Sequence, residues 1–171
     1  MVWIVLVVVV LLVAAIAWSY TRLVTLRNRT QMAWSQIDSQ LKRRADLIPE
    51  LTAVVAGYAA HEKAVLEEAS AARAGATSPD PTARAAQEQR VKQSVGGLIG
   101  VAEEYPELKA AERFSQLQTD LKDTEDKIAL SRMVYNDTVQ TFNTSIQRLP
   151  MSLIASPMGF AQRALFVPSA A

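Results

Sequence analysis

The chain has 171 residues, with 18 Lys and Arg, 17 Asp and Glu, one His and no Cys. Beyond an apolar N-terminal stretch, about 150 residues remain, enough for one domain whose core needs no disulfide. The near-neutral charge, mixed along the chain, disfavours a nucleic-acid binder, because such a protein needs a basic face. The lack of cysteine fits a reducing compartment but does not establish one, since a disulfide-free extracytoplasmic bundle is also allowed.

Residues 1–21 contain no charged side chain. A helix of about 20 apolar residues is roughly 30 Å long, which is the thickness of the hydrocarbon core of a bilayer. We therefore predict a single transmembrane helix over 1–21. The small residues of Ala15-Ile16-Ala17 would suit a cleaved secretory signal. However, no Lys or Arg precedes the apolar run, and the run continues past this triplet, so we prefer an uncleaved anchor.

Aromatic and basic side chains flank the predicted span. The residues expected at the membrane interface are Trp3, Trp18, Tyr20, Arg22, Arg27 and Arg29. Trp and Tyr gather at the headgroup level of membrane proteins, and Lys and Arg close to a span stay in the cytoplasm. Because the arginines all follow the span, we expect the N-terminus outside and the rest of the chain in the cytoplasm.

Residues 22–149 are predicted to form an antiparallel helical bundle. Starting at Ile37, eight of the ten positions at alternating steps of four and three, as far as residue 69, match an apolar seam. A period of about 3.5 residues held this long is typical of long helices that pack at shallow angles, including coiled coils. Pro49 lies inside this run and lacks an amide proton, so we expect the helix to kink or break near Ile48.

The segment Gly75–Pro81 is dense in Gly, Pro, Ser and Asp and predicts a turn between two helices. Asp80 or Thr82 can cap the helix that follows. Three glycines, Gly96, Gly97 and Gly100, interrupt that helix and are expected to weaken it or to allow close packing.

Pro106, after Tyr105, is expected in the first turn of a new helix. A last long helix with its own apolar seam should end at Pro150. No alternating strand pattern is found. The fold class is therefore all-α, with an N-terminal transmembrane helix followed by an up-and-down bundle of three or four helices.

The C-terminal tail, residues 150–171, carries a single charge, Arg163, and many large apolar side chains. Exposed to water, it would form an apolar patch. Three arrangements remain open for it. The tail can fold back on the bundle, meet another subunit or touch the bilayer.

Arg44 falls on the apolar seam of the first helix. A charge buried there must find a carboxylate, and Glu62, Asp120 and Glu125 are the candidates. Such a pair would fix the register of the helices, or the position would serve partner recognition. The residues for which both interpretations stay open are Trp34, Asp38, Arg44, Asp46 and Glu62.

We expect no enzymatic activity, no metal and no cofactor. His61-Glu62 begins like a His-Glu-x-x-His zinc helix, but position 65 is Val and the chain has no second His. The sequence contains no cysteine and no Gly-x-Ser-x-Gly elbow for a nucleophile. The glycines of Gly96–Gly100 lack the Lys of a phosphate-binding loop.

Eight short strings, in order and spread over almost the whole chain, resemble the bacterial LemA family. They are Val24-Thr-Leu-Arg-Asn-Arg29, Ala33-Trp-Ser-Gln-Ile-Asp38, Leu41-Lys-Arg-Arg-Ala-Asp-Leu-Ile-Pro49, Gly57-Tyr-Ala-Ala-His-Glu62, Glu104-Tyr-Pro-Glu-Leu-Lys-Ala110, Phe114-Ser-Gln-Leu-Gln118, Tyr135-Asn-Asp137 and Pro157-Met-Gly-Phe160. The resemblance implies a single-pass protein of the bacterial inner (plasma) membrane with a four-helix bundle. It supplies no settled biochemical activity. Members are associated with membrane proteostasis, sometimes beside membrane proteases, and one relative works at magnetosome membranes.

Three functions follow as hypotheses. The first is a non-enzymatic, membrane-anchored scaffold or adaptor whose partners are the lipid bilayer and other membrane proteins, a membrane protease among them. The second is a membrane-organising protein that assembles as a homo-oligomer. The third is an enzyme with a site inside the bundle. No nucleic-acid partner is expected.

Overall fold

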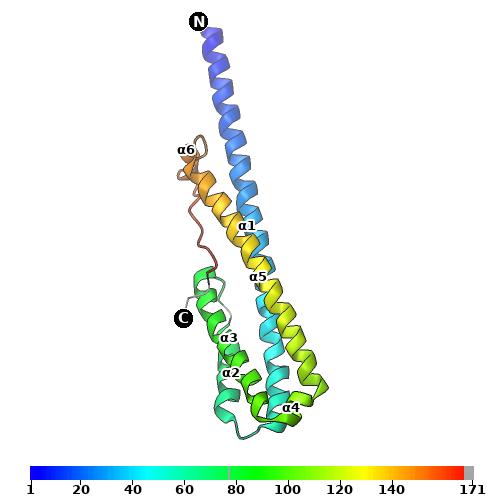
Figure 1. The fold of residues 1–171 in the computed structure, drawn as a ribbon. Coiled ribbons are helices and arrows are strands. Elements are labelled where there is room, and N and C mark those ends of the chain that lie inside the picture. Colours follow the sequence, from blue (N-terminus) through cyan, green and yellow to red (C-terminus); the bar gives the residue numbers. More distant parts are fainter. Residues whose placement is uncertain (77, 168–171) are drawn as a thin grey trace. The chain divides into compact units, whose positions relative to one another are not determined.

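The structure is a computed structural model that describes residues 1–76 and 78–167. Every element in these residues is a helix, which confirms the all-α prediction. The helices are α1 (Val2–Tyr58), α2 (Lys63–Gly75), α3 (Pro81–Glu104), α4 (Pro106–Ala110), α5 (Glu112–Gln147) and α6 (Ser152–Ala155), as drawn in Figure 1.

The chain divides into two compact units, and α1 and α5 run through both. The first unit consists of residues 1–35 and 133–165. The second consists, among the described residues, of 36–76, 78–132 and 166–167.

Helix α1 passes through Pro49 without ending, so of the two predicted outcomes near Ile48, a kink or a break, the break does not occur. Proline cannot donate to the carbonyl four residues earlier, which belongs to Ala45. Nε of Arg73 on α2 donates to that oxygen at 3.2 Å and takes the place of the missing amide. The helix ends instead at Tyr58, and the chain turns before α2 begins at Lys63. This turn was not predicted, because the apolar seam of the sequence continues from Ile37 as far as residue 69.

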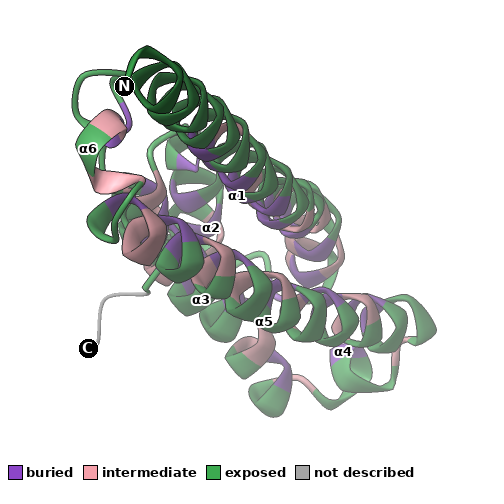
Figure 2. Cartoon of the chain, turned by 90° about the horizontal axis from the view of Figure 1, so that it is seen from above, coloured by how far each residue is buried: buried purple, intermediate pink, exposed green. Residues whose placement is uncertain are grey.

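The turn at residues 59–62 allows α2 to direct its own apolar side of small residues, Ala69 and Ala72, into the core of the second unit. All five helices of this unit contribute to that core, with Leu51 and Val55 from α1, among others. The remaining buried members include Val91, Leu98, Leu108, Phe114 and Leu117. Figure 2 shows the buried residues as stripes along the helices, which is the pattern of amphipathic helices.

The core of the first unit joins α1, α5 and the tail. Its buried members are Leu23, Leu26, Phe142, Ile146, Ala155 and Phe160. The residues up to Leu165 in the tail therefore fold back on helices of the same chain, which was the first of the three arrangements left open. Two hydrogen bonds of 2.9 Å hold this return, because the side-chain amide of Asn143 bonds both the N–H and the C=O of Arg163.

The expected local signals position the remaining helix ends. Asp80 caps α3, since its Oδ2 accepts a hydrogen bond from the amide of Ala83 at 2.8 Å. The three glycines do not interrupt α3. A Cβ added at Gly97 would lie 3.5 Å from Cγ1 of Val65, an ordinary contact between α3 and α2. Pro106 is the first residue of α4, and α5 ends before Pro150.

The N-terminal part of α1 differs from the rest of the fold in its exposure. All side chains from Val2 to Trp18 are exposed, although the segment is strongly apolar. In length and composition, α1 has a stretch sufficient to cross a membrane, with a mean hydropathy of 2.9 over 18 residues.

Candidate functional site

A cluster of four charged side chains lies inside the second unit, where α1, α3 and α5 meet. Arg44 of α1 is 5% exposed and pairs with the buried carboxylate of Glu88 on α3. Its Nη1 donates to Oε2 of Glu125 on α5 at 2.5 Å. Nζ of Lys92, one turn after Glu88, contacts Oε1 of Glu125 at 3.1 Å. Two cations and two carboxylates thus neutralise one another and connect three helices.

Glu125 is one of the three partners predicted for Arg44, whereas Glu88 was not predicted. The other two candidates, Glu62 and Asp120, are both described by the structure, and neither is within ion-pair distance of Arg44. Glu88 could have been found, because it stands on the buried seam of α3 three residues before Val91. A charge on an apolar seam indicates a buried partner, and the same argument that singled out Arg44 applies to Glu88.

The electrostatics of the cluster follow from burial and pairing. Burial lowers the pKa of Arg44, and Glu125 only partly opposes this shift. Burial would raise the pKa of Glu125, but the positive charges of Arg44 and then Lys92 outweigh it, so the pKa of Glu125 is lowered. Within the described residues, Nε of Arg44 and Oε1 of Glu88 have no hydrogen-bond partner.

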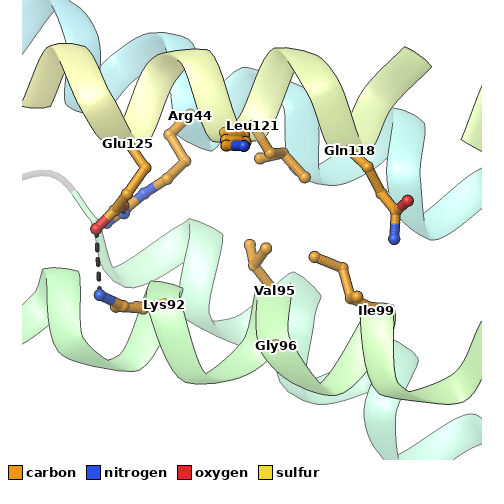
Figure 3. Close-up of a pocket in the computed structure, with 9 residues that line it drawn as sticks. Arg44, Lys92, Val95, Gly96, Ile99, Gln118, Leu121 and Glu125 are labelled. Carbon is orange, nitrogen blue, oxygen red and sulfur yellow. Dashed lines mark hydrogen bonds and ion pairs between the residues drawn. The ribbon is translucent and has the colours of Figure 1, made fainter. Parts of the chain in front are cut away.

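A pocket of about 270 Å³ opens beside this cluster. Figure 3 shows Val95 and Ile99 of α3 facing Leu121 of α5, with the charged group at one end of the pocket. The pocket therefore combines apolar walls with a charged end. Its charges are already paired with each other.

A second, polar pocket of about 410 Å³ brings together two of the residues singled out from the sequence, Asp38 and Asp46. Arg84 of α3 lines it as well, is 3% exposed and lies 3.9 Å from Oδ1 of Asp38. Burial lowers the pKa of Arg84, while the nearby Asp38 raises it in part. Arg84 is a second buried arginine that the sequence analysis did not identify.

The remaining residues singled out from the sequence lie elsewhere. Trp34 is half-buried and packs against the ring of Tyr135, with ring centroids 5.4 Å apart. Glu62 lies in the turn before α2 and accepts a 3.4 Å hydrogen bond from the hydroxyl of Tyr105. Burial, and next the charge of Glu62, raises the pKa of Tyr105. His61 lies in the same turn and is exposed. Across the described residues, no group of three or more His, Cys, Asp or Glu could hold a metal ion.

The six residues predicted at the membrane interface all lie on α1 and are exposed. Tyr20 makes an edge contact with Phe160 of the tail, with ring centroids 6.1 Å apart. Tyr20, at the end of the apolar segment, is therefore next to the tail.

These features define a class of all-α protein in which an apolar N-terminal helix continues into a helical bundle. The LemA family matches residues 33–171, and the chain belongs to this family. Magnetosome protein MamQ 2 of Paramagnetospirillum magneticum is 26% identical over 188 residues, covering 92% of this chain and 68% of its own. Magnetosome protein MamQ of Magnetospirillum gryphiswaldense is 26% identical, covering 82% of this chain and 62% of its own. Protein LemA of Metamycoplasma hominis is also 26% identical, covering 84% of this chain and 66% of its own.

Proposed function

We propose that this chain is a non-enzymatic, membrane-anchored scaffold or adaptor whose helical bundle binds other membrane proteins. One observation carries the proposal. The same continuous helix, α1, provides both the exposed apolar segment near Val2–Trp18 and buried residues in the cores of both units, such as Leu23 and Leu51. Because no loop separates the apolar segment from the bundle, anchoring this segment keeps the bundle at the membrane surface.

The proposed orientation has the N-terminus outside and the bundle in the cytoplasm of a bacterial inner membrane. The support is the charge pattern, with Arg22, Arg27 and Arg29 after the apolar segment and no Lys or Arg before it.

We assign the Arg44 cluster to the register of α1, α3 and α5 rather than to chemistry. Its support is that each charge in the cluster faces an opposite charge of the same chain. Buried polar groups of this kind can select one alignment of helices, because a slipped alignment would leave a charge without its partner.

The anchoring and the orientation can be tested with single cysteines, because the chain has none of its own. Trp3→Cys and Asp123→Cys are introduced separately into the full chain in bacterial cells and treated with a membrane-impermeant maleimide. We expect the protein to stay in the membrane pellet after carbonate extraction. The thiol at position 3 should be labelled in spheroplasts, and the thiol at position 123 only after lysis. Release by carbonate would overturn the anchor, and the reverse labelling would overturn the orientation.

A further inference from the structure

The C-terminal tail is held at the end of the predicted membrane span. Phe160 contacts Tyr20, and Ala155 and Phe160 share a buried cluster with Leu23 and Leu26 of α1. At about 1.5 Å per residue, Leu23 lies only about 5 Å beyond Tyr20 along the helix axis. In Figure 1, α6 accordingly lies beside the N-terminal part of α1. A span that ends near Tyr20 would therefore bring this part of the tail to the surface of the bilayer.

The tail buries only one side in this contact. Ala155 and Phe160 are 4% and 8% exposed, whereas Leu149, Leu153 and Met158 are 74%, 71% and 52% exposed. Arg148 precedes this stretch and Arg163 follows it, and the residues between them carry no charge. Large apolar side chains exposed within a stretch of ten residues, without a charge among them, favour a segment that binds a partner or a membrane.

The charge of the surrounding unit is one-sided. Residues 1–35 and 133–165 contain five arginines, at positions 22, 27, 29, 148 and 163, and one carboxylate, Asp137, which gives a net charge of +4. The whole chain has a net charge of only +1. Basic residues next to a membrane span are attracted to the anionic lipids of the cytoplasmic leaflet.

We propose that residues 149–158 form a second membrane contact, in which Leu149, Leu153 and Met158 enter the boundary between headgroups and acyl chains. The five arginines of this unit would favour a leaflet rich in anionic phospholipid. The inference rests on the proposed anchor and adds to it a lipid-binding surface and a lipid class. Continuity with the span favours lipid over a second copy of the chain as the occupant, because the tail is fixed beside the residues at which the span ends. Exposed apolar side chains that enter the boundary between headgroups and acyl chains anchor interfacial segments.

The test places an environment-sensitive nitrobenzoxadiazole label on single cysteines of the full chain, reconstituted in vesicles. Leu153→Cys reports the tail. Leu130→Cys is the matched control, because Leu130 on α5 is a leucine of similar exposure, 58%, outside this unit. Val9→Cys reports the span. Vesicles consist of phosphatidylcholine, with or without phosphatidylglycerol, and quenching is measured with lipids that carry a nitroxide on the acyl chain.

We expect blue-shifted emission and nitroxide quenching at positions 9 and 153, neither effect at position 130, and a larger shift at position 153 when phosphatidylglycerol is present. A label at 153 that emits as in water, while the label at 9 is quenched, would overturn the second contact and leave the anchor intact. A blue shift at 153 without quenching would overturn it as well, because the label would then be covered by protein. An unquenched label at 9 would overturn the anchor itself, and the lipid contact with it.

A second variant tests the same surface without a label on it. Leu153→Ser and Met158→Ser are combined in the full chain with a label at Ser156→Cys, an exposed position between them. Because both side chains are exposed, the thermal unfolding temperature in detergent should stay unchanged. We expect the quenching of the label at 156 to fall towards the value at position 130. Unchanged quenching would contradict a contact made through these two side chains.

Discussion

Nε of Arg73, on α2, donates a 3.2 Å hydrogen bond to the carbonyl oxygen of Ala45, on α1. This carbonyl is the one to which residue 49 would donate in a regular helix, and residue 49 is proline. A contact between two helices therefore supplies the donor that the sequence of α1 lacks.

We predict that Arg73→Met destabilises the protein by about 1 kcal/mol, the usual net value of one hydrogen bond. In a Pro49→Ala background the same change should cost less, because the amide of residue 49 would then serve the carbonyl of Ala45. Thermal unfolding of the four proteins of this cycle in mild detergent measures the coupling. Arg43→Met, at an exposed position on α1, is the control and should be neutral. If Arg73→Met lowered stability equally with Pro49 and with Ala at position 49, Arg73 would not be replacing the missing amide.

Arg44→Met should be strongly destabilising, by about 3 kcal/mol, because it leaves the carboxylate of Glu88 buried without a cation. The combined variant Arg44→Met, Glu88→Met should recover much of this loss, since it removes both buried charges together. Denaturant unfolding followed by circular dichroism compares the two variants. If the combined variant were less stable than Arg44→Met alone, the pairing would not be the source of the cost.

The loss of folding stability at low pH should depend on Glu125. Its pKa is lowered in the folded state, so the folded protein binds this proton less readily than the unfolded chain does. The resulting stabilisation is present above the unfolded pKa of about 4.3 and is lost as the pH falls through the lowered folded value. Glu125→Gln should therefore reduce stability at neutral pH and flatten its decline below about pH 4. The free energy of unfolding is measured against pH for the native protein and for Glu125→Gln. Parallel curves would contradict this role of Glu125.

Asn143 should control the attachment of the tail, because its side-chain amide bonds both backbone groups of Arg163. Asn143→Asp keeps the acceptor but removes the donor, and Asn143→Leu removes both. We expect amide hydrogen exchange of residues 160–165 to accelerate in the order native, Asp, Leu. Asn28→Leu, on the exposed surface of α1, is the control and should leave the exchange of the tail unchanged.

The helices and their seams followed from local patterns, while the polar partners did not. The seam from Ile37 to Val55 is buried as predicted, because a repeat of apolar residues determines which side of a helix leaves water. The end of α1 at Tyr58 was missed, since Gly57 is a weak signal and Pro49 a strong one. The donor that replaces the missing amide comes from Arg73, which is distant in sequence and gave no local signal.

The candidate site shows the same limit. That Arg44 needs a carboxylate could be predicted from its place on the seam, and Glu125 was among the candidates. Which carboxylates reach it depends on how three helices pack, and this arrangement also brings in Glu88. Asp38 and Asp46 were singled out because they belong to sequence strings that resemble the LemA family. Only the fold shows that both line one pocket with Arg84.

The most direct test of the proposed function is photo-crosslinking in native membranes. A benzophenone amino acid replaces one exposed residue of the full chain at a time, at Arg43, Glu67, Gln93 or Asp123 on the four long helices. After irradiation, mass spectrometry identifies the crosslinked proteins and the N-terminal peptide of the chain. We predict that the N-terminal peptide is recovered as part of the chain. We also predict that at least two of the four positions crosslink to the same membrane protein, and that this protein is not a copy of the chain. Crosslinks only between copies of this chain, or a chain that has lost its apolar segment, would contradict the membrane-anchored adaptor.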